Sequence, residues 1–227
     1  MSTVRAVLFD LDGTLADTAP DLAQALNATL EAFGHPPLAE ERIRPVVSHG
    51  SIALIRLGFG LEPDDPGFEA RRRHLLDHYA HNLCRHTRLF PGTEALLDAL
   101  AARAIPWGIV TNKPAWLTDP LVEQLAMPQP PGCVVSGDTC AQRKPHPMPL
   151  LHACRRLKVD PAAALYVGDA QRDMEAGKAA GMTTVCARFG YIHPDEQPET
   201  WPADHHIHTP GELLELIDRN VVNREET

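Results

Sequence analysis

The sequence predicts an α/β fold, a doubly wound parallel sheet with an inserted helical domain. From residue 90 onward, short apolar runs alternate with helical segments, which is the pattern of parallel strands joined by helices. Another apolar run stands near the N-terminus, whereas residues 16–89 hold helical patterns and no convincing strand. We therefore expect an α/β core domain formed by residues 1–15 and 90–227, with residues 16–89 inserted as a second, helical domain.

The first expected strand ends in two acidic residues. Residues 7–9 are a continuous apolar run, as in strands that are covered on both faces. Asp10 and Asp12 follow at the carboxyl end of this strand, where ligands bind in open α/β sheets. A polar Asp-Gly turn accounts for Asp12 and Gly13 but leaves Asp10 unexplained.

The other elements follow in order along the chain. Residues 19–34 carry leucines at helical spacing and end at a glycine before two prolines, which predicts a helix. Further helices of the insert are expected near 39–47, 51–58 and 66–86. In the core we expect helices at 91–103, 114–127, 147–157 and 171–182, strands at 105–112, 132–138, 163–170 and 183–189, and a short β-like edge segment at 205–208.

Composition restricts the class of protein. The chain has 227 residues with 44% hydrophobic and 22% charged residues, as in ordinary globular proteins. A net charge of −9 argues against non-specific nucleic-acid binding, which needs a basic face. No stretch resembles a signal peptide or a membrane span, and the five cysteines are odd in number without CxxC spacing. These features predict a cytoplasmic protein with reduced thiols and no membrane partner.

Polar residues follow four of the expected strands. Because parallel strands place their carboxyl ends at one edge of the sheet, these side chains are expected to converge there. Two carboxylates about 4 Å apart repel by about 4 kcal/mol at an effective dielectric of 20, so the cluster needs a cation. Oxygen ligands without His or Cys favour Mg²⁺, and a hydroxyl and an ammonium beside the metal suit a phosphate ester. The residues are Asp10, Asp12, Thr111, Asn112, Lys113, Lys144, Asp169 and Asp173.

The motifs "DLDGT" and "GDAQRD", together with Thr111 and Lys144, resemble those of the haloacid dehalogenase superfamily, and specifically of its phosphatases. The resemblance covers nearly the whole chain and implies that residues 16–89 are a helical cap domain. It departs from many relatives at Ala170, where those relatives carry Ser or Asp. An acid two residues after the first aspartate further indicates a phosphatase or a phosphomutase, because a halide leaving group needs no proton.

The resemblance implies a role for each residue. Asp10 is expected to attack phosphorus and form an aspartyl-phosphate, while Asp12 exchanges protons with the leaving alcohol and the attacking water. Mg²⁺ is expected on the carboxylates of Asp10 and Asp169 and on the backbone carbonyl of Asp12. The resemblance also implies that Thr111 and Lys144 stabilise the transferring charge, and that Asp173 orients Lys144 or a metal-bound water.

The substrate is less well predicted. Residues 48–58 occupy the place of a substrate loop in phosphoglycolate phosphatases, so His49 and Arg56 are candidate substrate contacts beside Thr111, Asn112 and Lys144, although both also suit solvated positions. The stretches "TNKP" (111–114) and "GYIHPDEQPETW" (190–201) resemble bacterial phosphatases that act on N-acetylmuramic acid 6-phosphate.

Residues 190–201 form a long loop for which two hypotheses are open. It either brings Tyr191 or His193 near the substrate or forms a structural lid over the sheet edge.

The expected function is therefore a Mg²⁺-dependent phosphomonoesterase of the phosphoglycolate phosphatase type that acts on a small phosphate ester. N-acetylmuramic acid 6-phosphate is the alternative substrate. A hexose phosphomutase would use the same acid, and a catalytically silent binding module on the same fold would lack Asp10, Asp12 or Lys144, none of which is missing. The sequence is compatible with a monomer or a homodimer.

Overall fold

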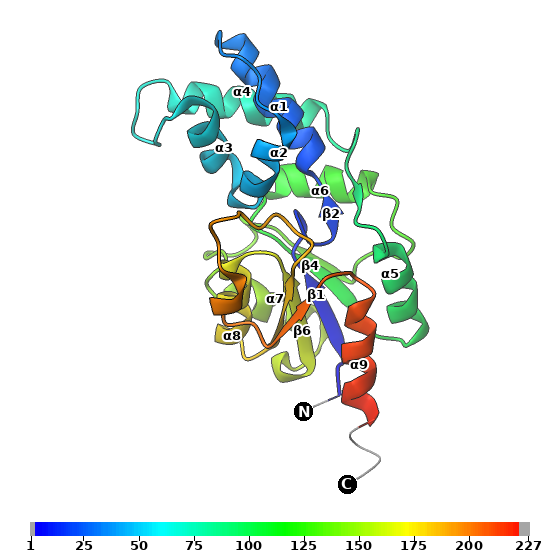
Figure 1. Cartoon of the computed structure of the whole chain (residues 1–227). Coiled ribbons are helices and arrows are strands. Elements are labelled where there is room, and N and C mark those ends of the chain that lie inside the picture. Colours follow the sequence, from blue (N-terminus) through cyan, green and yellow to red (C-terminus); the bar gives the residue numbers. More distant parts are fainter. Residues whose placement is uncertain (1–2, 223–227) are drawn as a thin grey trace.

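The computed structural model describes residues 3–222 and contains a six-stranded parallel sheet in the order β5-β4-β1-β6-β7-β8 (Figure 1). This arrangement confirms the predicted doubly wound α/β fold. Strand β1 lies between β4 and β6, and its register pairs Phe9 with Ile109 on one side and Val167 on the other. The strands are β1 Ala6–Phe9, β4 Trp107–Val110, β5 Cys133–Val135, β6 Ala164–Gly168, β7 Thr183–Ala187 and β8 His205–Ile207.

Helices cover both faces of the sheet because alternate residues of each strand point to opposite sides. Val7 and Phe9 of β1 belong to a core shared with α5, α6 and α9, whereas Ala6 and Leu8 belong to a second core shared with α7 and α8. Figure 1 shows α5 and α9 on one side of the sheet and α7 and α8 on the other. These helices are α5 Thr93–Ala102, α6 Ala115–Gln124, α7 Met148–Leu157, α8 Gln171–Ala179 and α9 Glu212–Val222.

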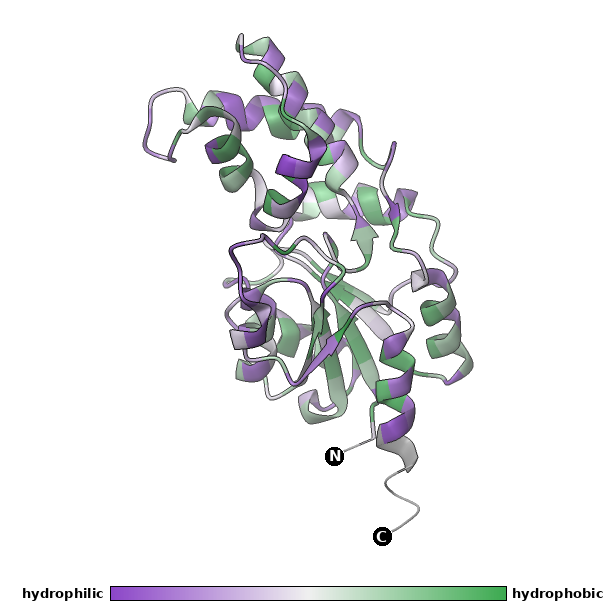
Figure 2. Cartoon of the chain, in the orientation of Figure 1, coloured by the Kyte–Doolittle hydropathy of each residue, from purple (hydrophilic) through white to green (hydrophobic). Residues whose placement is uncertain are grey.

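Hydropathy follows this arrangement (Figure 2). The central strands are hydrophobic along their length, while α9 carries one hydrophobic and one hydrophilic face. Helix α9 therefore buries its hydrophobic face, with Leu213 and Ile217, in the core on this side of the sheet. No helix among residues 3–222 combines the length and apolarity that a membrane crossing requires.

The four helices α1–α4 form a separate layer above the sheet edge, here called the helical insert (Figure 1). Helices α1 and α4 pack against each other along the insert. Asp21, buried at the start of α1, accepts hydrogen bonds from the backbone of His86 and Thr87 and so ties the outgoing chain to the returning one. The insert comprises α1 Ala19–Ala32, α2 Glu40–Ile43, the 3₁₀ helix Arg44–His49, α3 Gly50–Phe59 and α4 Phe68–His81.

One small sheet was not predicted from the sequence. Strands β2 (Ala16–Asp17) and β3 (Arg88–Leu89) pair antiparallel where the chain enters and leaves the helical insert. The expectation that no strand lies between residues 16 and 90 was therefore wrong. Two residues are too few to show the alternation that marks a strand, so only the tertiary pairing reveals them.

Candidate active site

Three carboxylates meet at the carboxyl edge of the sheet. Asp10 follows β1, Asp169 follows β6, and Asp173 lies in the first turn of α8. One oxygen from each lies within 4.8 Å of the others, and all three residues are buried. Neighbouring parallel strands bring Asp10 and Asp169 together, as the sequence predicts.

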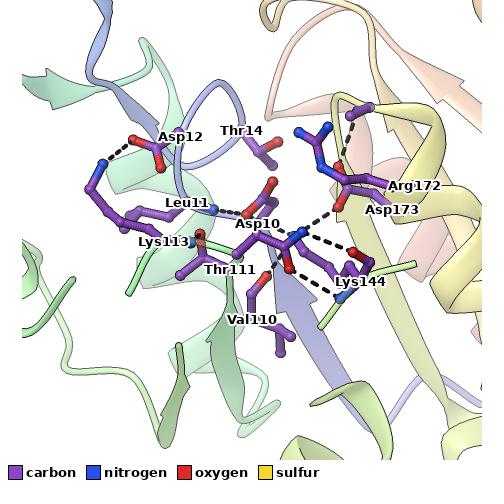
Figure 3. Close-up of polar contacts among 12 residues, drawn as sticks. Asp10, Leu11, Asp12, Thr14, Val110, Thr111, Lys113, Lys144, Arg172 and Asp173 are labelled. Carbon is purple, nitrogen blue, oxygen red and sulfur yellow. Dashed lines mark hydrogen bonds and ion pairs between the residues drawn. The ribbon is translucent and has the colours of Figure 1, made fainter. Parts of the chain in front are cut away.

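Lys144 lies between two of these carboxylates (Figure 3). Its Nζ is 2.9 Å from Asp10 Oδ1 and 2.8 Å from Asp173 Oδ1, and its side chain is fully buried. It also donates to the carbonyl of Val110 at 2.9 Å and to the hydroxyl of Tyr166 at 2.8 Å. Burial alone would lower the pKa of Lys144, but Asp10 and Asp173 raise it, so the ammonium stays charged.

Thr111 and Asn112 surround Lys144 in different ways. Asn112 donates to the carbonyl of Lys144 at 2.9 Å and accepts from its backbone N–H at 3.1 Å. Its amide thus holds the Lys144 backbone, rather than facing open space for a substrate. Thr111 is buried in the same group of residues (Figure 3), and its hydroxyl accepts from the backbone N–H of Lys113 at 3.2 Å.

The electrostatics of the cluster call for a cation. Burial raises the pKa of Asp10 to about 6, with Lys144 opposing the rise and Asp173 adding to it. Burial and the repulsion of Asp10 and Asp173 raise the pKa of Asp169 to about 7. Such shifts mean that the negative charge is incompletely compensated by the protein. The donors are all oxygens, so this group of side chains fits a hard divalent cation such as Mg²⁺.

Asp169 is held by its neighbours. Its Oδ2 accepts from Ser48 Oγ at 2.7 Å and from the backbone N–H of Tyr191 at 2.8 Å. Gly13 has a φ of +80°, and a Cβ on it would lie 2.1 Å from Asp169 Oδ2. Only glycine therefore permits the turn after Asp12 to approach this carboxylate. The sequence did not reveal Ser48, because it comes from the helical insert, 121 positions away.

Asp12 lies apart from Asp10 and Asp173 and faces Lys113 (Figure 3). Lys113 Nζ is 2.8 Å from Asp12 Oδ1, and Thr18 Oγ1 donates to the same oxygen at 2.6 Å. Burial alone would lower the pKa of Lys113, but the nearby Asp12 raises it. The sequence places Lys113 among the strand-end residues but indicates no role for it. Its position directly after Asn112, at the carboxyl end of the strand, could have indicated that its ammonium lies in the site.

The two predicted substrate contacts of the insert lie in different surroundings. His49 ends the 3₁₀ helix, and its Nε2 is 3.6 Å from Glu196 Oε1 in the 190–201 loop. Burial lowers the pKa of His49, and the charge of the nearby Arg172 lowers it further. Arg56 instead pairs with Glu62 at 2.5 Å in an exposed position. The structure brings His49 to the boundary of the site and leaves Arg56 outside it.

The 190–201 loop is anchored through Tyr191. The Tyr191 hydroxyl donates to Asp17 Oδ1 at 2.6 Å and accepts from the backbone N–H of Ala19 at 2.9 Å. Its backbone N–H meanwhile holds Asp169, as described above. The ring is 2% exposed, so Tyr191 connects the sheet edge to the entrance of the helical insert. His193 lies further out, 3.4 Å from Asp195.

Mg²⁺ is expected to stabilise the protein against heat. At a concentration of 100 Kd a bound ion adds about 2.7 kcal/mol, which for a chain of this size raises Tm by about 5–10 °C. Because the pKa values of Asp10 and Asp169 are raised, protons compete with the ion at low pH, and the shift is expected to be larger at pH 8 than at pH 5.5. Differential scanning fluorimetry with Mg²⁺ or EDTA measures it.

The matched control for this measurement is Asp169→Asn, which is expected to lose most of the shift. Potassium chloride of equal ionic strength controls for salt. An unchanged Tm of the wild-type protein across a Mg²⁺ titration at pH 8 would exclude the metal site.

Comparison with known proteins identifies a family and several relatives. The family model described as "Haloacid dehalogenase-like hydrolase" matches residues 7–187. An N-acetylmuramic acid 6-phosphate phosphatase of Pseudomonas aeruginosa is 41% identical over 95% of this chain and 96% of its own length. A phosphoglycolate phosphatase of Xanthomonas campestris pv. campestris is 43% identical over 93% of this chain and 95% of its own.

A solved structure has the same fold. The crystal structure of a predicted phosphoglycolate phosphatase from Haemophilus somnus superposes with a TM-score of 0.83 at 27% identity, covering 95% of this chain and 99% of the other. The relatives thus extend over the sheet and over the helical insert alike.

Proposed function

Because the chain belongs to the haloacid dehalogenase-like hydrolase family, we propose that it is a Mg²⁺-dependent phosphomonoesterase that hydrolyses a small phosphorylated acid. Its named relatives are phosphatases, so phosphate monoester hydrolysis is the activity that family membership supports. The observation that carries the proposal is the contact of Lys144 with Asp10 and Asp173, beside Asp169, at the edge of the sheet where ligands bind.

Asp10 is the proposed nucleophile. Its Oδ1 accepts from the backbone N–H of Leu11 at 2.8 Å and contacts Lys144, which fixes the carboxylate at the strand end. Lys144 would place a full positive charge beside the phosphate oxygens, and Thr111, directly after the neighbouring strand β4, would add a hydroxyl. Asp173 orients Lys144 through the 2.8 Å ion pair.

Asp12 is the proposed acid and base. Its carboxylate lies outside the cluster of Asp10, Asp169 and Asp173 and contacts Lys113, so it is available as a separate acid and base beside the nucleophile. The carboxylates of Asp10 and Asp169 and the backbone carbonyl of Asp12 would hold the metal, which when bound supplies positive charge to the phosphate oxygens.

The helical insert, with residues 16–89 as its domain limits, is proposed to act as a cap. Ser48 of the insert reaches Asp169, and the guanidinium of Arg172 in α8 donates to the carbonyl of Ser48. Asp10 and Asp169 are 5% and 1% exposed in this arrangement. Bulk solvent is therefore kept from the carboxylate while the acyl phosphate would form, and a single water is needed only for its later hydrolysis.

The substrate is proposed to be phosphoglycolate or a similarly small phosphorylated acid. The nearly complete burial of Asp10 and Lys144 beneath the helical insert suits a compact ester. N-acetylmuramic acid 6-phosphate is the second candidate, because the Pseudomonas relative of that name is 41% identical over almost the whole chain. Both esters are anionic metabolites, and both candidates imply action in the cytoplasm.

Phosphate release across a panel of esters tests these proposals. The panel contains phosphoglycolate, N-acetylmuramic acid 6-phosphate and hexose phosphates, each with Mg²⁺ and with EDTA. We expect Mg²⁺-dependent release that is highest with one of the two acids, and the higher kcat/KM decides between them. Isomerisation of a hexose phosphate without net release would indicate a mutase. No turnover of any ester in the presence of Mg²⁺ would favour a silent module.

A further inference from the structure

Two donors converge on one oxygen of Asp12. Lys113 Nζ lies 2.8 Å and Thr18 Oγ1 lies 2.6 Å from Asp12 Oδ1. The side chains of Lys113 and Asp12 are 7% and 16% exposed, so solvent competes little with these contacts. Oδ2 accepts no hydrogen bond from the residues that the structure describes, between 3 and 222. The two oxygens of this carboxylate are therefore chemically different.

Lys113 is itself held from several directions. Its carbonyl accepts from the backbone N–H of Gly137 at 2.8 Å and from Thr118 Oγ1 at 3.1 Å. Its ammonium lies 4.7 Å from the ring centre of Tyr79, a fully buried residue of α4 in the helical insert. Lys113 thus points at Asp12 because both its backbone and its ammonium group are constrained.

We propose that Lys113 is a positioning residue that, together with Thr18, holds Asp12 through Oδ1 and leaves Oδ2 as the oxygen that exchanges protons with the substrate. The inference rests on the proposed function, in which Asp12 is the acid and base. An oxygen that faces an ammonium and a hydroxyl donor has no room for a proton of its own. The oxygen left without a donor among residues 3–222, and so open to the substrate, is therefore Oδ2.

Each change in the bonds to phosphorus is accompanied by one proton transfer at Asp12. As Asp10 forms its bond to phosphorus and the ester bond breaks, the proton on Asp12 Oδ2 passes to the leaving oxygen and the alcohol departs. Oδ2 then takes a proton from water as the water oxygen bonds to phosphorus and the Asp10–phosphorus bond breaks. Phosphate leaves and Asp12 is protonated again. Throughout the cycle Lys113 keeps its own proton and its contact with Oδ1.

The leaving group distinguishes positioning from a general structural role. An alkyl alcohol needs a proton to leave, whereas p-nitrophenolate departs without one. Lys113→Met keeps the length of the side chain and removes the charge and the donors. We expect kcat/KM for alkyl phosphates to fall by about 10²-fold, the lower range of general acid catalysis, and to fall less than about 5-fold for p-nitrophenyl phosphate. The quantity kcat/KM reports the phosphorylation step, in which the acid acts.

Two further variants make the test decisive. Asp12→Asn is expected to show the same dependence on the leaving group. Lys178 is an exposed lysine of α8 that pairs with Asp204, and Lys178→Met is expected to leave kcat/KM for both kinds of ester unchanged. If circular dichroism shows that Lys113→Met is unfolded, Thr18→Val replaces it, because this change removes only the other donor to Oδ1. Thr18→Val is then expected to lower kcat/KM for alkyl phosphates more than for p-nitrophenyl phosphate.

Suppose that Asp12→Asn shows the leaving-group dependence and Lys113→Met loses activity equally on all esters. This result would overturn the role of Lys113 and leave the proposed function intact. Where Thr18→Val replaces Lys113→Met, an equal loss on all esters would overturn the proposal that donors to Oδ1 position Asp12. Absence of the dependence in Asp12→Asn itself would remove the acid that the proposed function assigns.

Discussion

Replacing Asp10 with asparagine is expected to reduce kcat for phosphate release by about 10⁴-fold or more, because an amide cannot act as the attacking carboxylate. The protein is expected to remain folded, since the change removes one of three buried carboxylates that repel one another. Steady-state release of inorganic phosphate measures the loss. Rapid acid quench with a ³²P-labelled ester is expected to trap label on the wild-type chain and none on the variant.

Asp138→Asn is a suitable comparison, because this aspartate is exposed and accepts from the backbone N–H of Ala115, outside the carboxylate cluster. It is expected to retain turnover within a few-fold of wild type. Near-normal turnover in Asp10→Asn would show that another group attacks phosphorus.

Lys144→Met is expected to lower the free energy of unfolding by about 3–5 kcal/mol at pH 8 in the absence of metal, because it removes the cation from a buried ion pair network. The lysine is fully buried and contacts both Asp10 and Asp173, so methionine of similar length leaves two carboxylates facing each other. Urea denaturation followed by circular dichroism measures the change. Activity is expected to be lost together with the positive charge beside Asp10.

Adding Asp173→Asn to Lys144→Met is expected to recover part of the stability, since one of the uncompensated charges is then gone. Lys178→Met, which removes an exposed lysine, is expected to change the free energy of unfolding by no more than about 0.5 kcal/mol. A loss in Lys144→Met no larger than that of Lys178→Met would contradict the electrostatic role.

Much of the fold could be predicted from local pattern. A buried parallel strand is a short run of apolar residues, and a helix repeats apolar residues at a spacing near 3.6, so the strands β1, β4, β5, β6 and β7 and the helices between them could be placed within a few residues. Because parallel strands end at one edge, the same pattern also predicted that Asp10, Lys144, Asp169 and Asp173 would lie together.

The partner of each polar group could not be predicted in this way. Lys144 contacts both Asp10 and Asp173, and Asp12 turns away from them toward Lys113, 101 positions further along the chain. The side chains that hold Asp169 and Asp12 come from the insert and its entrance, at Ser48 and Thr18. No local periodicity records such contacts.

The order of residues along the chain is enough to predict which side chains stand at the carboxyl edge of the sheet, since burial of apolar strands sets where each strand ends. Which of those side chains pair follows from the folded arrangement alone. Pairing depends on how segments far apart in the chain are oriented. A buried charge is stabilised by the opposite charge that the fold brings to within about 3 Å of it. For Asp12 that charge is Lys113, and this pairing separates Asp12 from the three clustered carboxylates.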